Sequence, residues 1–194
     1  MIEVSLSSSQ LYQDANVGVI RQVRNISDKR KPKYGAGDLN DWQIHIEGSC
    51  GEMVVSQYLN LYWDGNIGSL RANDVGHMEV RTRSKHHYDL IIHPDDKDEA
   101  KYILVTGING SYQIHGWIYG KEGKQQKYWS DPAKGRPAYF VPKTELRSLE
   151  TIFIGEADYE HLSGIYSSKT QKPENPGRIY EKRKRNYSST ESVS

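Results

Sequence analysis

Two charged side chains, Glu79 and Arg81, stand two positions apart in a segment whose pattern predicts a β-strand. Residues 78–82 alternate apolar and charged positions, which is typical of a strand with one buried face. Successive side chains of a strand point to opposite faces, so Glu79 and Arg81 point the same way, roughly 7 Å apart along the strand. Met78 and Val80 are then expected on the buried face. The pattern therefore aims a carboxylate and a cation at one place.

A second carboxylate, that of Asp74, precedes this strand. Gly76 lies between Asp74 and Glu79 and permits a turn, so the Asp74 carboxylate can swing back beside that of Glu79. Converging carboxylates suit a hard divalent cation, Mg²⁺ or Mn²⁺, because such cations prefer oxygen ligands. A positive side chain beside them can hold a scissile phosphate or an attacking water. The chemistry that these residues indicate is metal-dependent cleavage of a phosphodiester.

With Glu52 upstream, the motif resembles that of the PD-(D/E)XK nuclease superfamily, and more narrowly its phage-type and restriction-like members. The family pattern is an acidic residue on a first helix, then an Asp, then Glu-x-Lys on the following strand. The matching residues here are Glu52, Asp74, Glu79 and Arg81, and the resemblance covers about residues 48–141. At Arg81 the chain departs from the pattern, because Arg is always charged and presents a planar fork in place of a compact ammonium.

This resemblance implies a fold, a metal site and a set of catalytic residues. The fold would be an α/β (α+β) restriction-endonuclease-like core, with a mixed central β-sheet and flanking helices. A Mg²⁺ or Mn²⁺ ion would be held by Glu52, Asp74, Glu79 and the carbonyl of Val80. The catalytic residues would be Glu52, Asp74, Glu79 and Arg81.

Two functions from different classes are compatible with the motif. The first is Mg²⁺-dependent hydrolysis of DNA by an endo- or exonuclease, in which Arg81 stabilises developing negative charge or positions the nucleophilic water. The second is a nucleic-acid-binding or virion-associated protein that keeps the nuclease fold and cleaves poorly. The arginine at position 81 is the feature that favours the second function.

Hydrophobic periodicity places the motif among predicted helices and strands. Residues 7–26 predict a helix, or a helix pair broken near Gly18, and residues 41–61 predict a helix that carries Glu52. Five strands are expected to follow as a meander, at residues 67–71, 78–82, 88–93, 101–106 and 111–119. After a long polar connection, residues 139–142 predict a short strand, and residues 143–149 a helical turn or helix.

The charge of the chain is unevenly distributed. The 194 residues carry a net charge of +1, but residues 167–194 contain seven Lys or Arg against three Glu, which leaves about −3 for the rest. We predict one nuclease-like domain at 1–166, with an N-terminal helical segment and basic loop at 1–40 and a core at 41–150. Residues 167–194 are predicted to be a disordered basic tail because they are rich in Ser, Lys, Pro and Glu and poor in apolar residues.

No segment of the sequence has the composition of a signal peptide or of a membrane span. The single cysteine excludes an internal disulfide. We therefore expect a protein without a membrane partner in the cytoplasm, which for a viral protein means the host cell cytoplasm.

DNA is the expected partner, and basic and aromatic residues outside the motif are candidates for contacting it. Lysines and arginines neutralise phosphates, and exposed aromatic rings stack on bases. The candidates are Lys29, Arg30, Lys31, Lys33, His87, Trp129, Arg136, Arg183, Lys184 and Arg185. A homodimer is compatible with paired cuts, and other phage or DNA-processing proteins are compatible partners.

Other residues of the sequence offer alternative chemistry. The seven histidines are scattered and lack the His-Glu-x-x-His spacing of zinc hydrolases, and no phosphate-binding loop or dinucleotide glycine motif is present. Cys50 lies in no recognisable triad order. Asp95 and Asp96 could also reach a cation, although such a run is more often a hydrated turn.

Overall fold

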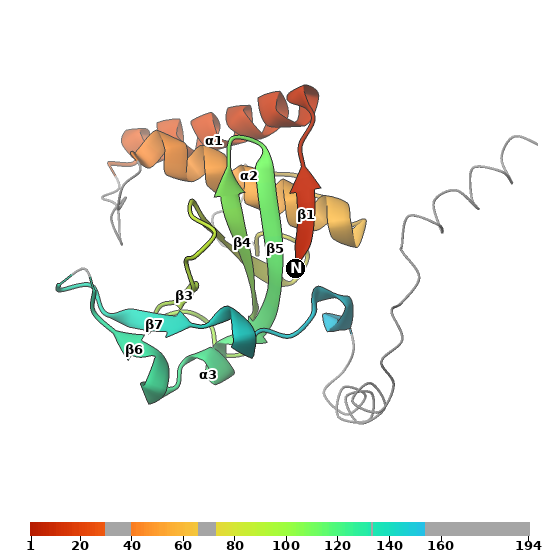
Figure 1. The fold of residues 1–194 in the computed structure, drawn as a ribbon. Coiled ribbons are helices and arrows are strands. Elements are labelled where there is room, and N and C mark those ends of the chain that lie inside the picture. Colours follow the sequence, from red (N-terminus) through yellow and green to blue (C-terminus); the bar gives the residue numbers. More distant parts are fainter. Residues whose placement is uncertain (30–39, 66–72, 133, 154–194) are drawn as a thin grey trace, which may run out of the picture. The chain divides into compact units, whose positions relative to one another are not determined.

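The computed structural model describes residues 1–29, 40–65, 73–132 and 134–153. The chain divides into one unit of Met1–Ile152 and another of Phe153–Ser194, and of the latter only Phe153 lies in the described ranges. The predicted boundary at residue 167, the basic tail and the predicted strand at 67–71 therefore lie outside the described residues. The helices and strands labelled in Figure 1 belong to the first unit.

Two long helices of this unit pack against each other. Helix α1 (Ser8–Ser27) begins after Ser7, and helix α2 (Asp41–Leu59) begins after Asn40. Each of these two preceding side chains accepts a hydrogen bond from an amide of the first turn, which satisfies a donor that has no partner within the helix. Helix α2 ends at Asn60, which adopts the left-handed conformation common at helix ends. The predicted helix at 41–61 is thus confirmed.

The predicted break near Gly18 is wrong, because α1 runs through this residue without interruption. Gly18 is buried where α1 packs on α2, and a Cβ atom at this position would lie 2.5 Å from Cα of Ile46. No side chain fits at such a distance. The glycine therefore permits a close approach of two helices and does not end one.

The larger sheet contains four strands in the order β1, β5, β4, β2. Their bounds are β1 Ile2–Ser5, β2 Met78–Arg83, β4 Lys101–Ile108 and β5 Ser111–Tyr119. Strands β4 and β5 form the predicted hairpin, which turns at Asn109 and Gly110, both with positive φ. The predictions at 78–82, 101–106 and 111–119 are confirmed, whereas the sequence did not indicate β1.

The predicted five-strand meander is wrong. Strand β2 pairs in parallel with β4, and the strand between them, β3 (Leu90–Ile92), belongs to a second sheet. That smaller sheet has the order β3, β7, β6, with β6 at Trp129–Ser130 and β7 at Ala138–Val141. The return from β2 to β4 is long enough for a parallel crossover, which periodicity alone does not distinguish from two hairpins.

Each face of the larger sheet is covered by a different layer. In β4, Ile103 and Val105 pack in the cluster that includes Val54 and Val55 of α2, whereas Tyr102 and Leu104 pack in the cluster that includes the smaller sheet. Helix α1 packs on α2 (Figure 1). The result is a mixed α+β unit, which confirms the coarse fold class. None of the helices in the described ranges combines the length and apolar character that a membrane crossing needs.

Short helical turns complete the unit. They are α3 at Gly120–Gly123 and three 3-10 turns, η1 at Gln126–Tyr128, η2 at Lys143–Glu145 and η3 at Leu149–Thr151. For residues 143–149 a helical turn or a helix was expected, and the structure has a helical turn, η2. The predicted strand near residue 140 is confirmed by β7.

Candidate active site

The predicted catalytic residues gather around β2, the edge strand of the larger sheet. An edge strand has backbone groups with no partner strand on one side. The carboxylate of Asp74 reaches this side, where its Oδ2 accepts a hydrogen bond from the Val80 amide at 2.7 Å. A tight turn makes this possible, in which Val75 pairs with Met78 and Gly76 has a φ of +58°. The turn expected at Gly76 is confirmed, and it returns Asp74 to the Val80 amide of β2.

Glu79 and Arg81 share one face of β2, as their spacing predicts. Arg81 Nη1 lies 3.7 Å from Glu79 Oε2. Met78 and Val80 point the other way and are buried with residues of α2. The face that carries Glu79 and Arg81 is therefore the one opposite α2.

Arg81 is held in place by a second carboxylate and an aromatic ring. Its Nη2 lies 3.0 Å from Asp96 Oδ1, and its guanidinium lies 4.9 Å from the centre of the Tyr102 ring. Asp96 Oδ2 in turn accepts a hydrogen bond from the His93 amide at 2.8 Å. Burial acts to lower the pKa of Arg81, but the negative charges of Asp96, Asp74 and Glu79 outweigh it, so the pKa is raised. Arg81 is thus a fixed positive charge beside the carboxylates, and Asp96 supports it.

Glu52 projects from the buried side of α2 and is fully engaged. Arg21 of α1 donates to both carboxylate oxygens, from Nη1 to Oε1 at 2.6 Å and from Nη2 to Oε2 at 2.7 Å. Trp63 Nε1 also donates to Oε2, at 2.9 Å. Arg21 Nη2 makes a further bond to the carbonyl of Gly65 at 2.7 Å. The predicted helical position of Glu52 is confirmed, but its partners are residues that the motif does not include.

The three motif carboxylates influence one another electrostatically. Burial raises the pKa of Asp74 well above its ordinary value, and the negative charges of Glu52 and then of Glu79 raise it further. The Val80 amide and Arg81 act in the opposite direction without cancelling this effect. The charges of two carboxylates from different elements, Glu52 on α2 and Glu79 on β2, thus both act on Asp74.

Asp14, on α1, is a fourth carboxyl near this group. Its side chain is buried, and neither carboxyl oxygen has a hydrogen-bond partner among the described residues. Burial, and then the charge of Glu52, raise the pKa of Asp14 to about 7. The carboxyl is therefore neutral over much of the pH range in which ordinary aspartates are charged.

The residues that could hold a metal ion approach β2 from two sides. Glu52 comes from α2, Asp74 lies along the open edge, and Glu79 lies on the opposite face. Within the described parts of the chain, no group of three or more His, Cys, Asp or Glu side chains is arranged to hold a metal ion. As chemical donors the three carboxylates suit a hard divalent cation, and Asp74 and Glu79 are the pair not bound by Arg21.

Cys50 and the histidines have other surroundings. Cys50 is buried, and burial raises the pKa of its thiol to about 12, so the thiolate that a nucleophile needs does not form near neutral pH. His45 contacts Asn25 at 2.9 Å. Thr106 links His86 and His115 through its hydroxyl, at 3.0 and 2.7 Å. These contacts are those of structural side chains.

The candidate DNA contacts are only partly described. Lys29 lies just beyond α1, whereas Arg30, Lys31, Lys33, Arg183, Lys184 and Arg185 lie outside the described residues. His87 packs edge-on against Tyr88, with ring centres 4.7 Å apart. Trp129 lies on β6 beside Tyr139, and Arg136 lies in the exposed segment before β7. The two latter residues belong to the smaller sheet and its connection, not to the edge of β2.

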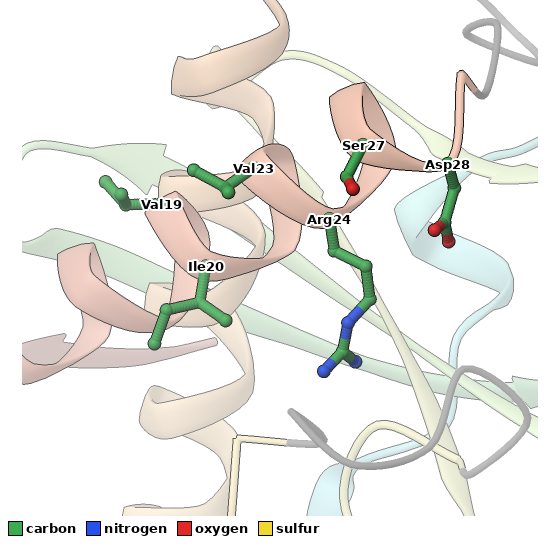
Figure 2. Close-up of a pocket in the computed structure, with 6 residues that line it drawn as sticks. All are labelled: Val19, Ile20, Val23, Arg24, Ser27 and Asp28. Carbon is green, nitrogen blue, oxygen red and sulfur yellow. The ribbon is translucent and has the colours of Figure 1, made fainter.

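The outer face of α1 carries a surface hollow unrelated to the carboxylates. It has a volume of about 460 Å³ and is lined by Val19, Ile20, Val23, Arg24, Ser27 and Asp28 (Figure 2). The apolar side chains among them are exposed. Nothing in the described ranges of the chain shows what covers this face.

Three residues that act on Glu52 or lie near it are not part of the motif, namely Arg21, Trp63 and Asp14. A weak pattern in the sequence does point to two of them. Asp14, Gly18, Arg21 and Asn25 recur at helical spacing, so polar or small residues occupy one face of α1.

Comparisons with protein-family models, with curated proteins and with solved structures give no match. The resemblance to the PD-(D/E)XK superfamily thus stays a prediction from the motif residues. The case for a function depends on the arrangement of these residues.

Proposed function

We propose that the protein hydrolyses phosphodiester bonds of DNA with the help of a divalent cation, Mg²⁺ or Mn²⁺. The observation that carries the proposal is the arrangement of the motif on β2, where the Val80 amide anchors Asp74 at 2.7 Å and Glu79 lies 3.7 Å from Arg81. The negative charges of Glu52 and Glu79 also repel that of Asp74, and together with burial they raise its pKa. A cation relieves this repulsion, and oxygen ligands are what such a cation requires.

Asp74 and Glu79 are the residues that would hold the cation first. Glu52 and the Val80 carbonyl would add further oxygen ligands. When bound, a divalent cation supplies Lewis-acid polarisation of a phosphoryl oxygen and lowers the pKa of a bound water. The residues of the chain fix the position at which this chemistry takes place, because the Val80 amide anchors Asp74 and the strand orients Glu79.

Arg81 would stabilise the negative charge that develops on the phosphate. Its guanidinium is held by Asp96 at 3.0 Å and by the ring of Tyr102, and so needs little reorganisation when charge develops nearby. The side chain thus supplies the positive charge that lysine supplies in the family pattern.

DNA is the proposed substrate because basic and aromatic residues outside the motif could contact it. The exposed Trp129 offers a ring for stacking, and Arg136 and Lys29 offer charge for phosphates. These contacts would hold the strand without reading its sequence.

Nicking of supercoiled plasmid by the purified full-length protein tests the proposal. We expect nicking that requires Mg²⁺ or Mn²⁺ and is lost in Glu79→Ala. The matched control is Glu99→Gln, which removes a carboxylate from an exposed turn of the same unit and should nick at the wild-type rate. Nicking that persists in Glu79→Ala, or in a chelator, would contradict the proposal.

A second candidate is a DNA-binding protein of the same fold that cleaves poorly. The observation in its favour is the engagement of Arg81 by Asp96, which ties up one side of the guanidinium fork. Such a protein would bind DNA in the absence of metal and leave plasmid intact. Binding without nicking at any metal concentration therefore selects this alternative.

A further inference from the structure

In the part of the chain that the structure describes, both carboxylate oxygens of Glu52 are occupied by one guanidinium. Arg21 binds them at 2.6 and 2.7 Å, and Trp63 adds a bond of 2.9 Å to Oε2. The Glu52 side chain is only 5% exposed. A cation that approached Glu52 in this arrangement would meet a positive charge already in contact with the carboxylate.

We propose that Arg21 competes with the divalent cation for Glu52. The Arg21–Glu52 pair is the closed form of the site, and full coordination of the cation requires Glu52 to leave the guanidinium. This inference rests on the proposed function and adds a regulatory element to the same site. Arg21 is in this view a positioning residue, because it acts through Glu52.

The physical basis is that a guanidinium and a dication cannot share one carboxylate without repulsion. Arg21 stays charged, since the nearby carboxylates of Glu52, Asp74 and Asp64 raise its pKa although burial lowers it. Its charge therefore opposes a cation at all accessible pH values. Exchange of partners is feasible, because the Gly65 carbonyl accepts a bond from the same guanidinium at 2.7 Å and can retain it after Glu52 departs.

Binding of Mn²⁺ to the full-length protein, measured by calorimetry without DNA, tests the inference. Arg21→Gln should bind Mn²⁺ roughly 10- to 100-fold more tightly than wild type, because a unit charge in contact with a ligand of the ion is removed. Arg21→Lys should bind only about threefold more tightly, because lysine keeps the charge but loses the fork. Lys127→Gln removes a charge that pairs with Glu145 on another surface and should leave the affinity unchanged.

A double variant shows whether the effect passes through Glu52. Arg21→Gln combined with Glu52→Gln should lose the gain in Mn²⁺ affinity, since the carboxylate that Arg21 guards is gone. Melting with and without Mn²⁺ supplies a second measurement, and Mn²⁺ should stabilise Arg21→Gln more than wild type. If Arg21→Gln does not fold, the Mn²⁺ affinity of Arg21→Lys tests the inference instead. An Arg21→Lys affinity for Mn²⁺ no higher than that of wild type would overturn it.

The outcomes separate the inference from the function on which it rests. Mn²⁺ binding that needs Glu79 but is equally tight in wild type and Arg21→Gln overturns the competition and leaves the metal site in place. A double variant that binds as tightly as Arg21→Gln overturns it as well. Absence of Mn²⁺ binding in wild type and in every variant overturns both proposals.

Discussion

The two ends of the candidate site hold their carboxylates in different ways. At the α2 end, the Glu52 side chain is 5% exposed and accepts two hydrogen bonds from Arg21, of 2.6 and 2.7 Å. At the β2 end, the Glu79 side chain is 16% exposed and lies 3.7 Å from Arg81 and 3.5 Å from Lys97. The first arrangement is a closed buried ion pair, and the second is a looser group of charges at the edge of a sheet.

This difference indicates where a ligand can enter. Breaking a buried pair by removing one partner leaves an uncompensated charge and is costly. Loose contacts of partly exposed side chains are weak, because solvent screens them. If the proposed site binds a cation or phosphate, we expect binding first at the Glu79 end and a response of the Glu52 end afterwards. Variants at the two ends should consequently differ in the size and kind of their effects.

The largest effect is expected for Asp74→Asn, because the carboxylates of both ends act on Asp74. Replacing the carboxylate by an amide should reduce metal-dependent nicking roughly 1,000-fold, since several kcal/mol of stabilisation by the cation depend on it. The melting temperature at pH 8 should stay equal or rise, because a buried charge is removed. Plasmid nicking and thermal melting measure the two quantities.

The control for this prediction is Asp98→Asn, which changes an exposed aspartate that pairs with Lys124. It should nick at close to the wild-type rate. Full activity in Asp74→Asn would show that the two ends do not share a ligand.

A somewhat smaller effect is expected at Arg81, and it depends on the replacement. Arg81→Gln should slow nicking roughly 100- to 1,000-fold, the cost of losing a preorganised charge aimed at developing negative charge. Arg81→Lys should keep measurable or even improved cleavage, because lysine restores the ammonium of the family pattern. Single-turnover nicking rates together with melting curves check both variants.

The melting curves distinguish a catalytic from a structural Arg81. A structural ion pair with Asp96 would make Arg81→Gln less stable, with a rate that falls only as the folded fraction falls. Equal nicking rates in wild type, Arg81→Lys and Arg81→Gln would remove Arg81 from the mechanism.

The next effect concerns stability and pH at Asp14, on the Glu52 side. A carboxyl whose folded-state pKa of about 7 lies above its unfolded value holds its proton more tightly when folded. The Asp14 carboxyl therefore contributes its full stabilisation at pH values below its pKa in the unfolded chain. This stabilisation is lost as the pH rises through about 7, its pKa in the folded protein. Asp14→Asn cannot ionise, so at pH 8 it should be more stable than wild type by roughly 2 to 4 kcal/mol.

Denaturant unfolding at pH 5 and pH 8 checks this prediction. The advantage of Asp14→Asn over wild type should be large at pH 8 and small or absent at pH 5. An advantage that is the same at both pH values would mean that Asp14 does not titrate in this range.

The smallest effect is expected for Lys97→Ala. Lys97 is 62% exposed and 3.5 Å from Glu79, so solvent screens most of their attraction. Nicking rates and Mn²⁺ affinity should change by no more than about threefold, because exposed pairs contribute little. A change as large as that predicted for Arg21→Gln would remove the contrast between the two ends.

Local patterns in the sequence were sufficient for several elements and for part of the site. Alternation in residues 78–82 gave the strand and the shared face of Glu79 and Arg81, because side chains of a strand alternate whatever the rest of the fold. The turn at Asn109 and Gly110, between the predicted strands 101–106 and 111–119, is equally local, since both residues tolerate positive φ. The position of Glu52 on a helix followed in the same way.

Only the tertiary structure decided which elements meet. The periodicity of α1 gives a helix but not its inward face, and the polar side with Asp14 and Arg21 is the one that packs on α2. Strand β2 pairs in parallel with β4 because a crossover carries the chain through a second sheet. The partner of Glu52 lies 31 residues away along the chain. Such long-range contacts depend on the packing of whole elements, and the spacing of neighbouring residues does not specify that packing.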